Sequence, residues 1–141
     1  MIDLALAARM TQAALDSAED IGALVSAAVV DAGGHLVHFQ RMDRAEVAGP
    51  TLAVDKAFTA VAHRIETAAL GPLTAPGGPL WGLQANGGGR YVVFAGGLPC
   101  WYGGVVVGGV GVSGGTAEED AACAGAALSV FESLAADKLR G

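Results

Sequence analysis

Two apolar runs near the N-terminus are joined by four residues that favour a tight reversal of the chain. The first run, residues 24–31, is rich in Val, and the second, residues 35–42, places His38 and Met42 on one face. The joining residues Asp31-Ala32-Gly33-Gly34 suit a hairpin turn, because glycine reaches positive φ angles without steric cost. We therefore predict a β-hairpin and, with it, a mostly antiparallel sheet.

Three segments with helical periodicity surround these strands. Residues 2–20 repeat apolar side chains at three-to-four spacing, and Gly22 suits the end of that helix. A second helix is predicted to open at Gly49-Pro50 and to fade near residue 70. A third begins at a capping box formed by Thr116 and Glu119 and runs to about residue 139. The buried stripe expected for the second helix is Val54, Phe58, Val61 and Ile65.

The segment between the last two helices is rich in glycine. Residues 73–89 read as an ordered loop, because Leu80 and Trp81 need burial. Strands are predicted at 91–95, 100–102 and 105–113, with turns at 96–99 and 103–104, which makes a β-meander. The predicted order is α-β-β-α-β-β-β-α, an α/β (α+β) fold with helices against a five-stranded sheet, in one domain spanning residues 1–141.

Charge and composition limit the partners of this chain. The net charge is −6 and no Lys/Arg cluster occurs, so binding to nucleic acid or to an anionic membrane is not expected. No apolar run is long enough to span a bilayer and no signal peptide is visible, which predicts a cytoplasmic protein. Charged residues make up only 16% of the chain, which favours a homo-oligomer. Cys100 and Cys123 are expected to be reduced core thiols.

Four segments together resemble the GlcG/HbpS family, which is similar to the C-terminal domain of PduO-type cobalamin adenosyltransferases. They are residues 30–36 (VDAGGHL), 41–43 (RMD), 94–99 (FAGGLP) and 110–115 (VGVSGG), the last followed by Glu118-Glu119-Asp120. The resemblance covers residues 2 to about 135. It implies a profilin-like sheet of five antiparallel strands flanked by helices, assembly into dimers up to octamers, and haem binding in several members.

The chain departs from its haem-binding relatives in ways that point to a pocket altered for another ligand. The segment after the Gly96–Pro99 turn is Cys100-Trp101-Tyr102, where the family usually carries a short aliphatic and charged stretch. No histidine precedes His35, although some relatives use an N-terminal histidine. A Thr beside the Gly-Val-Ser-Gly-Gly motif is implicated in one branch, and Thr116 has that position.

The glycine pairs are candidates for ligand contact, because they let backbone N–H groups approach an anionic or carbonyl ligand. Turn formation alone is the competing interpretation. The predicted pocket lies between residues 41–43, 87–89 and 96–99. The ligand-binding candidates are Met42, Lys56, Gly88, Gly96, Gly97, Pro99, Trp101 and Thr116.

His38 and His63 are the candidate axial ligands if haem, the possible cofactor, is bound. Each could instead be an ordinary core or surface histidine. The leading hypothesis is a protein that binds a small molecule, haem or another flat organic ligand. The alternative is a cofactor-free isomerase, lyase or cyclase in which Asp43 transfers a proton and Arg41 holds an oxyanion. A third possibility is an accessory subunit without a ligand.

Overall fold

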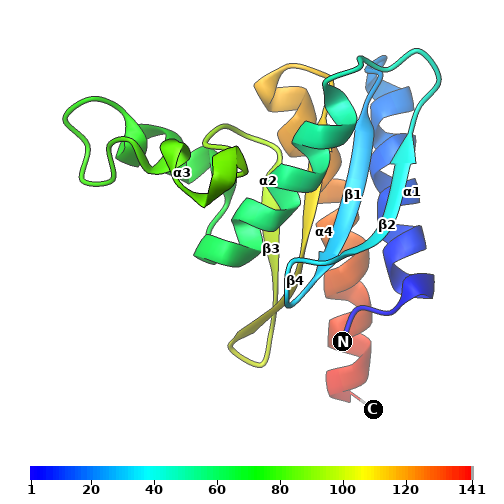
Figure 1. The fold of residues 1–141 in the computed structure, drawn as a ribbon. Helices are drawn as coiled ribbons and strands as arrows, with labels where there is room; N and C mark the ends of the chain where they lie inside the picture. Colours follow the sequence, from blue (N-terminus) through cyan, green and yellow to red (C-terminus); the bar gives the residue numbers. More distant parts are fainter. Residues whose placement is uncertain (141) are drawn as a thin grey trace.

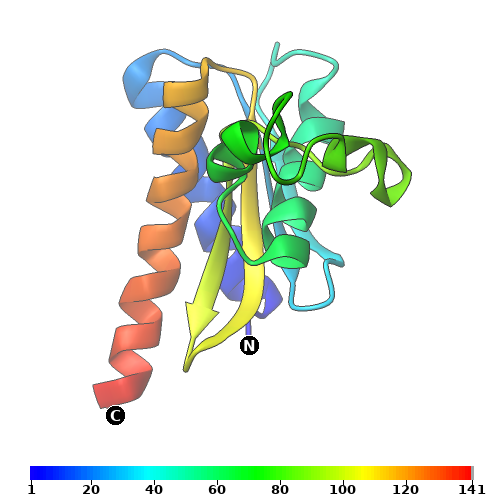
Figure 2. The same ribbon diagram turned by 90° about the vertical axis from the view of Figure 1, so that its left-hand side faces the viewer.

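The computed structural model describes residues 1–140 and the side chains of residues 1–137, and it has three layers. The middle layer is a four-stranded antiparallel sheet in the order β2-β1-β4-β3. Helices α1 and α4 cover one face of this sheet and α2 covers the other, as Figures 1 and 2 show. The elements are α1 (Leu4–Ile21), β1 (Ser26–Asp31), β2 (Leu36–Arg41), α2 (Gly49–His63), α3 (Thr67–Thr74), η1 (Leu83–Ala85), η2 (Gly87–Gly89), β3 (Gly97–Tyr102), β4 (Val105–Ser113) and α4 (Ala117–Arg140).

The predicted N-terminal hairpin is confirmed, and local hydrogen bonds explain it. The Asp31 carboxylate accepts hydrogen bonds from the backbone N–H groups of Gly33 and His35, both at 2.9 Å. Gly34 has a φ of 81°. The predicted end of the first helix is also confirmed, since Gly22 closes α1 in the left-handed region. The helix begins two residues later than predicted, after the N-cap Asp3, whose carboxylate accepts from Leu6 N–H.

The capping box of α4 is present in both directions. Glu119 N–H donates to Thr116 Oγ1 at 3.2 Å, and Thr116 N–H donates to Glu119 Oε1 at 2.9 Å.

Within the part of the chain that the structure describes, no helix combines the length and the apolar character needed to cross a bilayer.

Two predictions about the second half of the sheet are wrong. The sheet has four strands, because residues 91–95 pack against α2 instead of pairing with a strand. The backbone N–H of Val92 donates to Thr59 Oγ1 at 3.0 Å, and the Tyr91 ring lies edge-on to His63 at 4.4 Å between centroids. Residues 97–99, predicted as a turn, begin β3, where Pro99 is tolerated because β3 is an edge strand.

The predicted long second helix is interrupted. It ends at His63 because Arg64 adopts a left-handed φ of 55°, and the chain then starts the short helix α3. Residues 67–89 project from the body of the molecule (Figure 1), and Leu80 and Trp81 are exposed there. The expectation that these two side chains are buried is therefore wrong for this chain.

The buried face of α2 also differs from the predicted stripe, whose four residues are only half-buried. The fully buried side chains of α2 are those of three alanines, Ala53, Ala57 and Ala60. The longer side chains of Lys56 and Thr59 are buried beside them. The reason lies in the strands beneath: a Cβ at Gly111 would collide with the Ala53 carbonyl oxygen, and one at Gly109 would lie 2.8 Å from the Ala57 carbonyl oxygen. Glycines on β4 thus let the α2 backbone rest directly on the sheet.

Gly111→Ala should lower the free energy of unfolding by roughly 1–3 kcal/mol, because the added methyl group forces α2 away from β4. Gly125→Ala is the matched control, since nothing lies within 4 Å of a Cβ at that α4 position. This control should be neutral or stabilise by up to about 1 kcal/mol. Urea unfolding followed by circular dichroism measures both, and equal stability of the two variants would contradict the packing argument.

Candidate functional site

A cavity of about 420 Å³ opens beside Asp43, where the predicted pocket was expected to begin. One wall is the C-terminal half of α1, and the other is the segment that follows β2. The volume lies within the range of small-molecule sites, roughly 300–1,000 Å³. The lining residues are Gln12, Leu15, Asp16, Glu19, Gly22, Ala23, Leu24, Met42, Asp43 and Arg44.

A hydrogen-bonded chain of side chains extends from this cavity along the seam between α1 and β2. Gln40 Nε2 donates to Thr11 Oγ1 at 3.0 Å and lies 3.4 Å from Gln12 Oε1, a residue of the cavity wall. Thr11 Oγ1 in turn lies 2.8 Å from His38 Nδ1. Because side chains alternate along a strand, His38, Gln40 and Met42 share the face of β2 that meets α1. These hydrogen bonds link His38 to the cavity wall, and we call the cavity together with this seam the α1–β2 groove.

The charge of the cavity wall is mainly negative. Asp16, Glu19 and Asp43 contribute three carboxylates, and Arg44 contributes the single cation of the wall. Arg41 points elsewhere: its guanidinium donates to the Ala45 carbonyl oxygen at 2.8 Å and so holds the loop after β2. A neutral or cationic group suits this cavity better than an anionic one.

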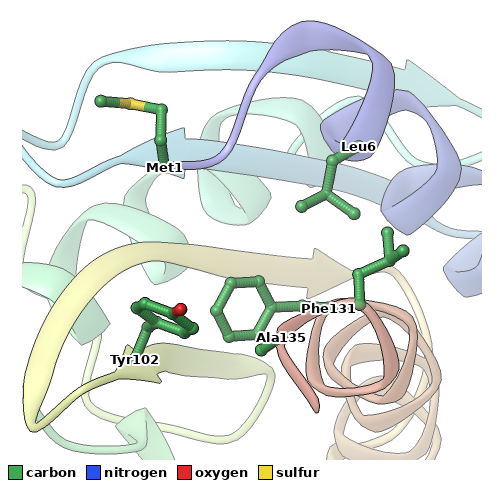
Figure 3. A pocket seen from close by; sticks show the side chains of 6 residues that line it. Met1, Leu6, Tyr102, Phe131 and Ala135 are labelled. Atoms are coloured by element: carbon green, nitrogen blue, oxygen red, sulfur yellow. The ribbon is translucent and has the colours of Figure 1, made fainter. Parts of the chain in front are cut away.

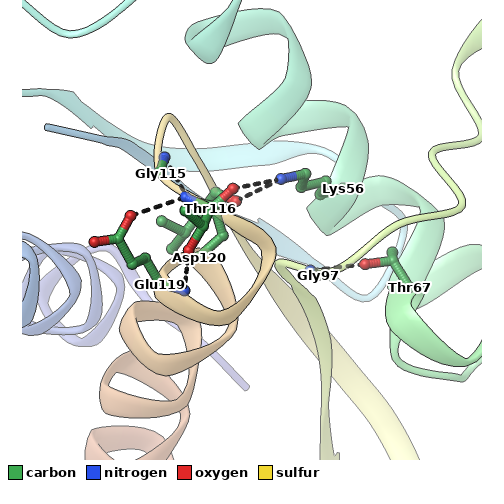
Figure 4. Close-up of polar contacts among 8 residues, drawn as sticks. Lys56, Thr67, Gly97, Gly115, Thr116, Glu119 and Asp120 are labelled. Atoms are coloured by element: carbon green, nitrogen blue, oxygen red, sulfur yellow. Dashed lines mark hydrogen bonds and ion pairs between the residues drawn. The ribbon is translucent and has the colours of Figure 1, made fainter. Parts of the chain in front are cut away.

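Lys56 and Asp120 form a buried ion pair at the end of the sheet next to the α4 N-terminus (Figure 4). The Lys56 ammonium, 1% exposed, donates to Asp120 Oδ2 at 3.1 Å and to the Val112 carbonyl oxygen at 2.9 Å. Asp120 Oδ1 accepts from Gly115 N–H at 2.8 Å. The Phe94 ring lies over the ammonium, with its centroid 5.1 Å away. Sequence reasoning placed Asp120 only as a charge in the first turn of a helix, because nothing local shows that its partner is 64 residues away.

Desolvation is the largest cause of the pKa shifts of both members of this pair. Burial lowers the pKa of the Lys56 ammonium, and the Asp120 carboxylate only partly opposes that shift. Burial likewise raises the pKa of the Asp120 carboxyl, against the attraction of Lys56. Each charge is therefore tolerated in the core chiefly because the other is present.

Two of the glycines predicted to contact a ligand, Gly96 and Gly97, are packed tightly against neighbouring atoms. Gly97 lies against the Lys56 backbone and the Thr67 side chain, whose hydroxyl accepts from Gly97 N–H at 2.9 Å (Figure 4). Gly96 lies against the Val112 carbonyl oxygen and Lys56 Nζ. Of the three glycines among the ligand-binding candidates, Gly88 in the projecting segment is the one with nothing within 4 Å of an added Cβ. The amides of Gly96 and Gly97 thus serve helix-to-sheet packing.

The structure separates the predicted site into several places. Met42 and Asp43 line the cavity, with Asp43 exposed at its mouth. Thr116 caps α4, and Pro99 is half-buried in the edge strand. Trp101 is 48% exposed on the same strand. The proton-transfer role of Asp43 stays a prediction.

The three histidines have distinct surroundings. His38 meets α1 on one face of the sheet, whereas His63 belongs to α2 on the other, where its Nδ1 lies 3.3 Å from the Thr59 carbonyl oxygen. His35 is exposed at the hairpin turn beside Asp31. His38 and His63 therefore cannot ligate one iron within a single chain. Among the described residues, no group of three or more His, Cys, Asp or Glu side chains is placed to hold a metal ion.

A smaller apolar pocket of about 140 Å³ lies between α1, β3 and the C-terminal half of α4 (Figure 3). The Phe131 and Tyr102 rings line it, with Leu6 and Met1 on the opposite side. Nearby Cys100 is buried, and burial raises the pKa of its thiol to about 12, so the thiol stays protonated. Cys100 and Cys123 are both free and buried, which confirms the prediction of core thiols.

Comparisons with known proteins agree on one family. Residues 2–129 match the family described as "Haem degrading protein HbpS-like". The Klebsiella pneumoniae protein ORFY is 39% identical, with a TM-score of 0.90 over 93% of this chain and 90% of its own. A crystal structure of a PduOC:haem complex is 36% identical, with a TM-score of 0.84 over 86% of this chain and 88% of that chain. HbpS itself is 34% identical, with a TM-score of 0.82 over 90% and 87% of the two chains.

Two curated relatives extend this result. An uncharacterized 15.0 kDa protein from the dhaT-dhaS intergenic region of Citrobacter freundii is 43% identical over 94% of each chain. The corrinoid adenosyltransferase PduO of Salmonella typhimurium is 36% identical over 87% of this chain, which corresponds to only 37% of PduO.

Asp120→Asn should lower the free energy of unfolding by about 3–5 kcal/mol, because it leaves the Lys56 ammonium buried without a counter-charge. The double variant Lys56→Met/Asp120→Leu should recover most of that loss, since both charges are removed together. Urea titrations of the single and double variants measure the coupling.

Asp55→Asn is the matched control, because the Asp55–Arg90 pair also involves α2 but its arginine is 41% exposed. Its cost should stay below about 1 kcal/mol. A double variant as unstable as Asp120→Asn would contradict our account of the buried pair.

Proposed function

Because the chain belongs to the HbpS-like family, we propose that it binds a small organic molecule in the α1–β2 groove. Haem is the first ligand to test, since a relative 36% identical over 86% of this chain is described in complex with haem. The observation that supports the proposal is the open cavity of about 420 Å³ beside Asp43, whose wall residue Gln12 is linked by hydrogen bonds through Gln40 and Thr11 to His38.

His38 is the residue best prepared to hold a haem iron. Its Nδ1 is paired with Thr11 Oγ1 at 2.8 Å, which fixes the plane of the ring and leaves Nε2 for a ligand. Metal-binding histidines are commonly oriented in this way, by a hydrogen bond to the other ring nitrogen. The side chain is half-buried, so an approaching ligand reaches it without unfolding of β2.

The charge of the groove sets the orientation of such a ligand. Haem carries two propionate carboxylates, and these would be repelled by Asp16, Glu19 and Asp43 in the cavity wall. The residues therefore fit an axial nitrogen ligand but not a propionate inside the cavity, so the propionates would face solvent. When bound, haem would supply redox or gas-binding chemistry, and this chain would supply the ligand, the orientation and partial shielding from water.

Titration of the purified protein with haem should give a shifted Soret band that is lost in His38→Ala, because the ring nitrogen bound to iron is removed. His35→Ala is the matched control, since His35 is exposed at the hairpin turn and should leave the spectrum unchanged. No shift in the unaltered protein would exclude haem, and an unchanged spectrum in His38→Ala would exclude His38 as the ligand.

We also propose, from the low charge and the exposed apolar side chains of residues 80, 81 and 94, that the protein is a homo-oligomer. Native mass spectrometry of freshly purified protein should show more than one chain per particle and any retained ligand. A monomer at micromolar concentration would contradict the oligomer without affecting the groove.

A further inference from the structure

A second cavity, on the α2 side of the sheet, differs in chemistry from the α1–β2 groove. Its volume is about 250 Å³, and it lies where the C-terminal end of α2 approaches the β3–β4 hairpin (Figure 2). Val61 and Arg64 line it from α2 and the residue that follows, while Trp101 and Val105 line it from the hairpin. Because α1 lies on the opposite face, this cavity is separate from the proposed haem site.

Arg64 gives this cavity a positive charge with no compensating carboxylate in the wall. The guanidinium is exposed, and within the described residues it forms no ion pair and donates no hydrogen bond. The nearby Asp31 carboxylate is already occupied by His35 and by the Gly33 N–H. Although the chain as a whole has a net charge of −6, an arginine without an ion-pair partner in a concave surface can bind an anion through charge-assisted hydrogen bonds.

The backbone is irregular at both principal residues of this cavity. Arg64 has a φ of 55°, a conformation that costs energy for a residue with a Cβ, and its N–H bonds the Ala60 carbonyl oxygen. On the other wall, the pairing of β3 with β4 shifts register between Cys100 and Trp101. Such irregularities commonly re-aim a side chain beside a binding site. At this register shift, Trp101 is 48% exposed and lines the cavity.

The remaining wall is apolar. Val61 and Val105 are aliphatic, and Gly104 in the hairpin turn adds no side chain to the wall. An aromatic ring fits against an indole and aliphatic groups, and a carboxylate fits an arginine through two parallel hydrogen bonds. The size of the cavity allows a single ring and excludes a tetrapyrrole.

We propose that this cavity binds a small monocyclic aromatic carboxylate, with its ring against Trp101 and its carboxylate on Arg64. Binding needs both elements: the apolar wall alone would accept the neutral amide equally well, and the arginine alone would accept any small anion. The charge of the ligand therefore distinguishes this cavity from the acidic one beside Asp43.

The test uses benzoate and its neutral counterpart benzamide, followed by saturation-transfer NMR and by fluorescence in a Trp81→Phe background that leaves Trp101 as the reporter. Benzoate should bind and quench Trp101, while benzamide should bind roughly tenfold to a hundredfold more weakly, the factor expected for a charge-assisted hydrogen bond. Arg64→Gln should weaken benzoate by a similar factor and abolish the preference, and raised salt should weaken benzoate alone.

Arg44→Gln is the matched control, because Arg44 is the other non-glycine residue with positive φ and it lines the acidic cavity. It should leave benzoate binding unchanged, and so should His38→Ala, so that this result is independent of the haem test. Circular dichroism checks that Arg64→Gln is folded, and Arg64→Lys provides a second variant that keeps the charge. Absent benzoate binding, equal affinity for benzamide, or benzoate binding unaffected by Arg64→Gln would each overturn the proposal.

Discussion

Direct contact between the backbone of α2 and the backbone of the strands beneath it is the constraint on which the rest of the structure depends. Glycines 97, 109 and 111 leave no side chain between helix and sheet, so alanines on α2 suffice to fill the interface. An ordinary helix-on-sheet contact is spaced by larger side chains, and a close approach of this kind tolerates no added methyl group. The glycines on β3 and β4 therefore serve this packing, whereas most of those with positive φ serve turns, loops and caps.

The same close approach explains the buried charge. Lys56 lies on the face of α2 that rests on the sheet, so its ammonium cannot reach solvent and must find partners at the sheet end. Asp120, the Val112 carbonyl group and the Phe94 ring supply them. The pair thereby joins α2 to the first turn of α4, two helices on opposite faces of the sheet. Because desolvation offsets much of the attraction between the two charges, the pair adds little net stability even though loss of one partner is costly.

The helices cover the sheet closely, and the two candidate ligand cavities lie at its margins. The acidic cavity and His38 lie along the seam between α1 and the edge strand β2, and the basic cavity lies between α2 and the other edge, near β3. The two have opposite charge, so the two proposed sites would favour different ligands. Membership of the HbpS-like family accounts for the fold of the chain, whereas our proposals for ligand choice rest on these few side chains at the margins.

Local chemistry determined much of the fold without tertiary information. The Asp31–Gly34 turn, the cap at Gly22, the capping box at Thr116 and the strand at 105–113 each depend on residues a few positions apart, and all are found. Tertiary structure decided the remainder. Residues 91–95 have a strand-like composition, but the backbone N–H of Val92 donates to Thr59 on α2. Arg64 ends a helix although no glycine occurs there. Lys56 finds its buried counter-charge in Asp120, which is 64 residues away. Sequence patterns report preferences of neighbouring residues, whereas burial, charge pairing and cavities arise where distant segments meet.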